Sequence, residues 1–353
     1  MRGARRFLAH ESRSKYTLFQ RKWQGYLKKT AYFWLIICFF VYLHPFFQRE
    51  ESFVSLYKRF AREKWVNMAW YLHNKELGLN NKEQDIFMDK KIKALFFDID
   101  GTLVSFKSHR IPQSTVDALE QAKKNGVEVY ISTGRPKQII NNLGQIEHLI
   151  DGYITANGAR CFVEDTLVSQ HAILPSDVKK IIEAADRDNY PAIVVSESRF
   201  AIHHYTDEVY EIFCKGLGVD SSIFITDVDA LGDEAILQVT PFCTVEQEAL
   251  LMPTLENCTS GRWHPAFTDI TAHGADKGKG LQAMADYLGL NIEETMAFGD
   301  GGNDISIIKK AGVGVAMGNA GDELKQVADY ITTHVDEDGV KNALIKYGVI
   351  AEN

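Results

Sequence analysis

The chain has 353 residues, a formal net charge of −8 at pH 7 and 45% hydrophobic residues, a composition typical of a soluble globular protein with room for two domains. The charge is uneven: residues 1–87 hold 16 Lys and Arg against 7 Asp and Glu, whereas the remainder holds 23 against 40. An acidic body argues against nucleic acid as a partner, because phosphate backbones require a basic surface.

Residues 1–87 differ in composition from the rest. They contain four of the five Trp, three of the 26 Gly and one apolar run, AYFWLIICFFVYL at 31–43. The run is short for a membrane span, which needs roughly 20 residues. We expect 1–87 to be an extension without a role in the chemistry, disordered or upstream of a start at Met88, in a cytoplasmic protein. The alternative is membrane anchoring through residues 31–47.

Strand and helix patterns alternate from residue 88 to residue 158. Short apolar runs rich in β-branched and aromatic residues predict strands, and apolar residues three or four apart predict helices. The predicted strands are 92–98, 127–132 and 151–158, and the predicted helices are 112–126, which Ser114 or Thr115 can cap, and 135–143, with Pro136 in its first turn.

The pattern changes between residues 159 and 268, where hairpins mix with helices. We expect this segment to be a separate α+β unit inserted into the first domain. Its predicted strands are 159–165, 166–173, 192–198, 200–205, 236–242 and 261–267. Its predicted helices are 176–189 and 207–218, and the last two strands flank the segment 245–255.

Residues 269–353 return to the alternating pattern. The predicted strands are 295–300, 313–318 and 329–332, and the predicted helices are 303–312, 322–328 and 338–348. Such alternation predicts a parallel sheet covered on both faces. The expected fold class is α/β, a doubly wound parallel-sheet core with an inserted α+β cap domain.

Polar residues follow several of the predicted core strands. Ligands of open parallel sheets bind beyond the carboxyl ends of the strands, so these residues are expected to form one site. They are Asp98 and Asp100, then Thr133, Gly134 and Arg135, then Asp300, Asn303 and Asp304, with Lys277 at a predicted helix start.

This set of side chains suits phosphoryl transfer. A carboxylate such as Asp98 can attack phosphorus and form an acyl phosphate. Asp100, two residues on and beside Gly101, can protonate the leaving group and later deprotonate water. Mg²⁺ prefers oxygen ligands, and Lys, Thr and Asn side chains with backbone N–H groups can hold phosphoryl oxygens.

The sequence from Met88 onward resembles the haloacid dehalogenase superfamily, and within it the Cof-type sugar-phosphate phosphatases with a large inserted cap. The matching motifs are DIDGTL (98–103), STGR (132–135), ANG (156–158), DITAHGADKGKGL (269–281) and GDGGND (299–304). The resemblance implies a Mg²⁺-dependent phosphatase that acts on small phosphorylated metabolites, with sugar (hexose) phosphates as the expected substrates.

The resemblance also implies roles for individual residues. Asp98 would be the nucleophile and Asp100 the acid and base, with Lys277 as a further catalytic group. The metal residues would be Asp98, Asp100 through its backbone carbonyl, Asp300 and Asp304, the last as a ligand or as a support. The phosphate or substrate residues would be Thr133, Gly134, Asn303, Arg135 and Asn157, of which Arg135 and Asn157 could instead serve the helix start and the turn.

Other readings stay open. A phosphomutase of the same superfamily would need the same motifs, and a membrane-tethered, non-enzymatic binding protein would use the fold alone. In the inserted unit, Arg262 and His264 could reach the cleft, whereas His203 and His204 are interpreted as ordinary residues because no partner spacing supports a metal site. We expect a monomer or weak oligomer whose partner is a small phosphorylated molecule.

Overall fold

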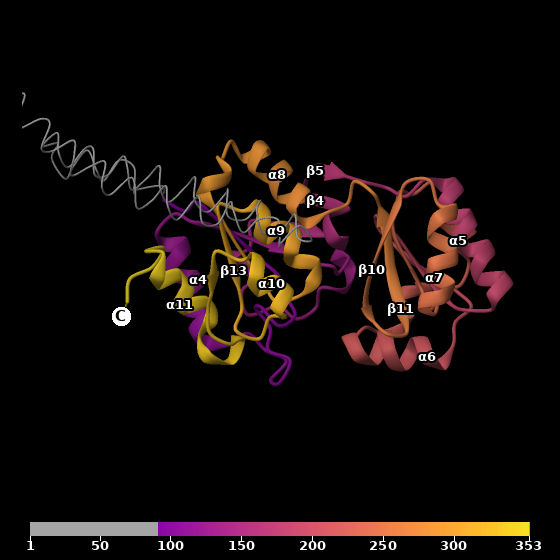
Figure 1. Ribbon diagram of the computed structural model, residues 1–353, viewed down its shortest axis with the longest axis horizontal. Helices are drawn as coiled ribbons and strands as arrows, with labels where there is room; N and C mark the ends of the chain where they lie inside the picture. The colour runs from indigo at the N-terminus through magenta and orange to yellow at the C-terminus, as the bar shows by residue number, and fades with distance from the viewer. Residues whose placement is uncertain (1–90, 353) are drawn as a thin grey trace, which may run out of the picture. The chain divides into compact units, whose positions relative to one another are not determined.

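The computed structural model describes residues 91–352, apart from the side chain of Trp263. They belong to one compact unit, Asp89–Asn353, and are built around two β-sheets (Figure 1). The predictions about residues 1–87 lie outside the described residues. Among the described helices, none combines the length and the apolar character that a membrane crossing requires.

The first sheet has eight strands in the order β14-β13-β12-β1-β2-β3-β4-β5. Six are mutually parallel, and β4 and β5 add an antiparallel hairpin at one edge. The strands are β1 (Ala94–Phe97), β2 (Glu128–Ser132), β3 (Gly152–Thr155), β4 (Arg160–Val163), β5 (Thr166–Gln170), β12 (Thr295–Gly299), β13 (Val313–Ala316) and β14 (Tyr330–Ile331).

Helices cover both faces of this sheet because its central strands are apolar on both sides. Leu95 and Phe97 of β1 pack in one hydrophobic cluster with residues of α4 (Gln113–Lys124) and α11 (Gly339–Lys346). Phe96 packs in a second cluster on the opposite face. The helices that contribute to this second cluster are α8 (Lys277–Leu288), α9 (Ile305–Lys310) and α10 (Asp322–Val327).

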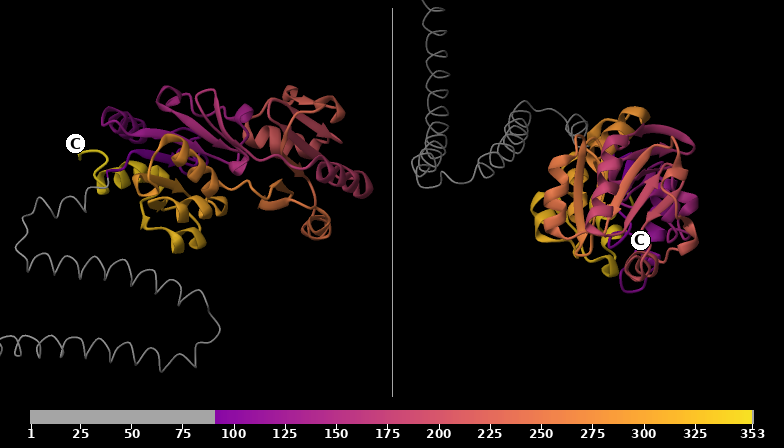
Figure 2. Two further views of the ribbon diagram at one scale, coloured as in Figure 1. Left: turned by 90° about the horizontal axis from the view of Figure 1, so that it is seen from above. Right: turned by 90° about the vertical axis from the view of Figure 1, so that its right-hand side faces the viewer.

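The second sheet lies in the inserted cap and has six strands in the order β10-β11-β9-β6-β7-β8. They are β6 (Ala192–Ser196), β7 (Phe200–His203), β8 (Phe224–Ile225), β9 (Ile236–Pro241), β10 (Cys258–His264) and β11 (Phe267–Ala272). The cap helices are α5 (Pro175–Asp188), α6 (Asp207–Val209), which continues as one π-helical segment Tyr210–Lys215, and α7 (Val245–Leu251). The chain passes between the two sheets twice, after β5 and after β11 (Figures 1 and 2).

The predicted hairpin at 159–173 forms, but it extends the first sheet. Tyr153 of β3 pairs with Phe162 of β4, and their rings stack with centroids 5.3 Å apart. The motif beginning at Asp269 lies in β11, which pairs with β9 and β10 in the cap sheet. Asp269 therefore comes from a cap strand.

Two local predictions were wrong. The helix expected at 135–143 is a single 3-10 turn, Lys137–Ile139. Pro136 and Ile140 on either side of it have extended backbone, and Asn141 Nδ2 instead donates to the carbonyl of Gly218, 2.8 Å away in the cap. The other error concerns α4, which has no side-chain cap.

The first turn of α4 begins after Pro112, and neither of the two expected capping residues bonds to its backbone. Ser114 Oγ lies 2.6 Å from Asp338 Oδ1, at the residue before α11. The hydroxyl therefore joins two neighbouring helices instead of capping its own.

Candidate active site

Asp98 lies at the carboxyl end of the central strand β1, with 8% of the residue exposed. Its backbone N–H donates to the carbonyl of Phe298 on β12, 3.1 Å away, which aligns the ends of the two strands. The chain then turns sharply at Gly101, where φ is 87°, a left-handed conformation that glycine adopts without strain. The turn brings Asp100 to the same edge of the sheet.

Lys277, the first residue of α8, is buried between two carboxylates. Its Nζ lies 2.7 Å from Asp98 Oδ1 and 2.6 Å from Asp304 Oδ1. Burial alone would lower the pKa of Lys277, but the charges of Asp304 and Asp98 outweigh it, and the net pKa is raised. The ammonium therefore stays protonated beside the Asp98 carboxylate.

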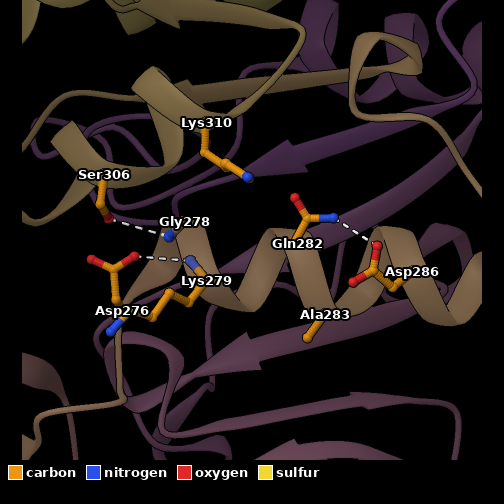
Figure 3. A pocket seen from close by; sticks show the side chains of 8 residues that line it. All are labelled: Asp276, Gly278, Lys279, Gln282, Ala283, Asp286, Ser306 and Lys310. Carbon is orange, nitrogen blue, oxygen red and sulfur yellow. Dashed lines mark hydrogen bonds between the residues drawn. The ribbon is translucent and has the colours of Figure 1, made fainter.

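The start of α8 is fixed by its own cap and by contact with α9. Asp276 Oδ1 accepts from the backbone N–H of Lys279 at 2.8 Å, and Gly278 N–H donates to Ser306 Oγ at 3.2 Å. A Cβ on Gly278 would meet the Ser306 carbonyl at 2.6 Å, so the close approach requires glycine. Figure 3 shows these contacts beside a pocket that residues of α8 and α9 line. They hold Lys277 in place.

Asp304 contributes both of its oxygens to the protein itself. While Oδ1 contacts Lys277, Oδ2 accepts from the backbone N–H groups of Asp300 and Gly301, at 3.1 and 3.0 Å. The residue is 1% exposed. This bonding shapes the loop after β12 and orients Lys277.

Asp300 is held from both sides. Thr102 Oγ1 donates to its Oδ1 at 3.1 Å, and Asn319 Nδ2 lies 3.3 Å from its Oδ2. Asn319 Nδ2 also donates to the carbonyl of Gly101 at 2.8 Å, which ties the loops after β1, β12 and β13 together. Burial and the charge of Asp304 raise the pKa of Asp300 to about 6.

Three carboxylates, those of Asp98, Asp300 and Asp304, have ligand atoms within 4.8 Å of one another. Burial also raises the pKa of Asp98, although Lys277 opposes the shift. Buried carboxylates crowded together disfavour their own charges, and a bound cation relieves that repulsion. An all-oxygen donor set suits a hard cation such as Mg²⁺.

Asp100 and Arg135 form a bidentate ion pair across the loops after β1 and β2. Arg135 Nε lies 2.7 Å from Asp100 Oδ2, and its second terminal nitrogen lies 2.9 Å from Oδ1. A third guanidinium nitrogen donates to the carbonyl of Ile139 at 3.3 Å. Arg135 thereby fixes the side chain of Asp100 at the edge of the cleft.

The loops after β2, β3 and β12 meet beside this pair. Thr133 is buried, and its Oγ1 accepts from the N–H of Arg135 at 3.1 Å. Asn303 Nδ2 donates to Asn157 Oδ1 at 3.0 Å, and Asn157 has a left-handed φ of 54°. A Cβ on Gly134 would stand 3.1 Å from Asn157 Oδ1, so glycine leaves room at this point.

These residues line a cleft of about 710 Å³ that cap residues also line, a size suited to a small metabolite. Eight of the predicted site residues line it, and Lys277 and Asp304 lie buried beside Asp98. The eight are Asp98, Asp100, Thr133, Gly134, Arg135, Asn157, Asp300 and Asn303.

The cap contributes a buried polar chain to the same cleft. Gln238 Nε2 donates to Thr240 Oγ1 at 3.1 Å, and the Thr240 hydroxyl donates to Asp269 Oδ1 at 2.7 Å. Gln238 and Asp269 both line the cleft. Within the described residues, Gln238 Oε1 is buried without a hydrogen-bond partner.

Arg262 and His264, the cap residues proposed from the sequence, are not among the residues that line the cleft. Arg262 instead pairs with Glu248 at 2.7 Å and donates to the carbonyl of Cys243. Four contributors were missed: Thr102, Asn319, Gln238 and Asp269. The available signal was a polar residue at an inward position of an apolar strand, as for Gln238 in ILQVTP.

The sequence matches one family model and is similar to proteins named as phosphatases. A family model described as haloacid dehalogenase-like hydrolase matches residues 95–344. The Bacillus subtilis protein YkrA, which bears a phosphatase name, is 31% identical over 268 residues, covering 74% of this chain and all of YkrA. The Bacillus subtilis 5-amino-6-(5-phospho-D-ribitylamino)uracil phosphatase YitU is 29% identical over 275 residues, covering 74% of this chain and 99% of YitU.

Solved structures show the same architecture. A sugar phosphatase of haloacid dehalogenase subclass IIB is 45% identical with a TM-score of 0.69, covering 73% of this chain and 100% of that one. A phosphatase of this superfamily from Bacteroides thetaiotaomicron is 35% identical with a TM-score of 0.67. The match covers 74% of this chain and 97% of that one. The expected fold class, a Rossmann-like core with an inserted cap, is confirmed.

Proposed function

This chain belongs to the haloacid dehalogenase-like hydrolase family and is a phosphatase, and we propose that it hydrolyses small sugar phosphates with Mg²⁺ through a phosphorylated Asp98. The observation that carries the proposal is the contact of Lys277 with both Asp98 and Asp304, beside Asp300, at one end of a cleft of metabolite size. The complete set of acidic residues and Lys277 in contact with one another argues against a non-enzymatic binding protein, the reading left open by the sequence.

The nucleophile is Asp98. Its carboxylate oxygen forms a bond to phosphorus while the bond from phosphorus to the leaving oxygen breaks, and an aspartyl phosphate results. Asp100 gives the leaving oxygen a proton. Asp100 then takes a proton from a water molecule whose oxygen attacks the same phosphorus, and this second step releases phosphate and restores the Asp98 carboxylate.

The metal residues are Asp98, Asp300 and the backbone carbonyl of Asp100, with Asp304 as their support. Their oxygen donors and crowded negative charge suit Mg²⁺. When bound, Mg²⁺ supplies positive charge that stabilises the phosphoryl oxygens and the nucleophile. Asp304 acts through its bonds to Lys277 and to the backbone of the loop after β12.

Removal of the metal tests this proposal. We expect the full chain to release inorganic phosphate from hexose phosphates in the presence of Mg²⁺, and EDTA to abolish the release until excess Mg²⁺ restores it. Phosphate should be measured together with the sugar products. Release that persists in EDTA would contradict the metal assignment, and an isomeric sugar phosphate in place of free phosphate would indicate a phosphomutase.

The phosphate residues are Thr133, Gly134 and Asn303, which line the cleft, and Lys277, which contacts Asp98. Hydroxyl, amide and ammonium donors held rigidly in place stabilise charge that develops on phosphoryl oxygens. Arg135 is proposed to act through Asp100, which it contacts with two hydrogen bonds. Asn157 orients Asn303.

The Asp100→Asn change should slow turnover without preventing phosphorylation of Asp98. An amide keeps the size of the side chain but cannot carry a proton between the leaving group and water. We expect a fall in kcat of about 10²–10⁴-fold, the range of acid and base groups. The fall in kcat/KM, which reports the phosphorylation step, should be smaller for p-nitrophenyl phosphate, whose leaving group needs no proton. Equal losses of kcat/KM for good and poor leaving groups would contradict an acid role.

Recognition of the sugar is assigned to Gln238 and Asp269 in the cap. The direction of the hydrogen bonds fixes their chemistry: Asp269 is the final acceptor, Thr240 donates to it, and Gln238 donates to Thr240. This order leaves Gln238 Oε1 as an acceptor without a partner in the described residues. A buried acceptor is costly unless a ligand donates to it, and a sugar hydroxyl is such a donor.

The Gln238→Ala change should therefore act on the sugar and not on the phosphate. We expect kcat/KM for hexose phosphates to fall about 10–100-fold, the loss typical of one buried hydrogen bond to a ligand. Activity on p-nitrophenyl phosphate, which lacks hydroxyls, should stay within about twofold of wild type. Gln282→Ala on α8, at a half-buried glutamine that does not line the cleft, is the control. A parallel loss on both substrates would show a structural role.

A further inference from the structure

The side chains of two adjacent histidines of the cap, His203 and His204, lie side by side. Successive side chains of an extended strand point to opposite faces. His204, however, directly follows β7 and has a left-handed φ of 57°, which turns its ring back beside that of His203. The two imidazole centroids lie 4.0 Å apart with 25° between the ring planes.

Both rings aim one nitrogen at the same carboxylate oxygen. Asp186 Oδ1, in the last turn of α5, lies 2.8 Å from His203 Nε2 and 3.3 Å from His204 Nε2. The three side chains offer ligand atoms that all lie within 4.8 Å of one another. The partner that sequence spacing did not reveal thus comes from another element, 17 residues upstream of His203.

We propose that His203, His204 and Asp186 bind Zn²⁺. Ligand atoms about 2.0–2.2 Å from a tetrahedral zinc ion are about 3.3–3.5 Å apart, and the observed separations of 2.8 and 3.3 Å need only small side-chain movements to reach that spacing. Two imidazoles and one carboxylate are a zinc donor set, and imidazole favours Zn²⁺ over Mg²⁺. Asp186 and His204 are more than one-third exposed, which leaves the fourth position to water.

The surroundings of Asp186 leave room for a cation. Asp186 forms ion pairs only with these two histidines among the described residues, so no lysine or arginine competes with a metal ion for its carboxylate. The site differs chemically from the cluster of Asp98, Asp300 and Asp304, which offers only carboxylates. A bound zinc ion would join the end of α5 to the end of β7 and would stabilise the cap against unfolding.

Zinc binding to the full chain tests the proposal. Saturating Mg²⁺ is kept in the buffer to occupy the carboxylate cluster, and Zn²⁺ is titrated against a chromophoric chelator. We expect wild-type protein to hold one Zn²⁺ with a dissociation constant at least about tenfold lower than that of His203→Gln or His204→Gln. His148 is an exposed residue outside the cap, and His148→Gln should have the same zinc dissociation constant as wild type.

Thermal unfolding gives a second readout with a further variant. Zn²⁺ should raise the Tm of wild type and of His148→Gln by several degrees, because a ligand of the native state stabilises it. It should leave the Tm of His203→Gln and of Asp186→Ala unchanged. Equal zinc affinity in wild type, His203→Gln and His204→Gln would overturn the proposal, and so would a bound zinc that only Asp98→Asn removes.

Discussion

The Asp98→Asn protein is expected to be folded and inactive. Its kcat should fall by at least about 10⁴-fold, as expected when the group that forms the covalent intermediate is removed, and no phosphoenzyme should form. The amide has the size of the carboxylate but cannot attack phosphorus. Rapid acid quenching after mixing with a radiolabelled sugar phosphate measures the phosphoenzyme directly.

The stability of this variant separates chemistry from folding. Burial raises the pKa of Asp98, so its charged form disfavours the folded state at neutral pH. A neutral amide removes that cost, and Lys277 keeps Asp304 as a partner. We therefore expect no fall in Tm. Asp165→Asn, in the exposed turn between β4 and β5, is the control, and robust turnover in Asp98→Asn would refute the assignment of the nucleophile.

Much of the core could be predicted because its strands are short, apolar and regularly separated by helices. The alternation of Leu95 and Phe97 with Phe96 places large side chains on both faces of β1, as a sheet covered on both faces requires. The parallel order then brings the strand ends together. Asp98, Thr133 and Asp300 were collected on that basis, and all three line the cleft.

Prediction from the sequence failed where contacts between distant segments determine the local structure. The run after Arg135 has helical spacing, but its Ile and Asn residues have low helix propensity, and Asn141 gains a hydrogen bond to the cap by leaving the helix. Arg135 was expected to contact substrate or to start that helix, whereas its guanidinium contacts Asp100. No local pattern reports such a pairing.

The cap was the least predictable part for the same reason. Gln238 and Thr240 share one face of β9, but only the antiparallel pairing of β9 with β11 brings Asp269 to Thr240. His203 and His204 were judged without a partner because Asp186 approaches from a helix. In each case the position in the strand predicts the face of the sheet on which a side chain lies. It does not predict which residue of another element contacts that side chain.

Replacement of Lys277 should cause a loss comparable to that of the nucleophile. We choose Lys277→Met, which keeps the apolar stem and removes only the ammonium. Without it, the carboxylates of Asp98 and Asp304 face each other unpaired, and phosphate loses a positively charged donor. We expect a fall in kcat of about 10³-fold or more and weaker inhibition by phosphate and vanadate.

The neighbouring Lys279 is the matched control. It lies two residues further along α8, and residues two apart on a helix do not share a face. Among the described residues its exposed Nζ donates only to the carbonyl of His273, 3.3 Å away, so Lys279→Met should retain nearly wild-type activity and vanadate inhibition. Serious damage from Lys279→Met, with Lys277→Met active, would mean that the wrong lysine has been assigned.

The two effects of Lys277→Met, on stability and on chemistry, can be separated. Breaking a buried ion pair by removing one partner costs about 3–5 kcal/mol of stability, so its Tm should fall. Asp304→Asn added to Lys277→Met removes one of the two unpaired charges and should recover part of the Tm. The double variant still lacks the ammonium group that would donate to the phosphate. If activity returned together with stability, Lys277 would be a structural residue, and if only stability returned, the ammonium acts on the substrate.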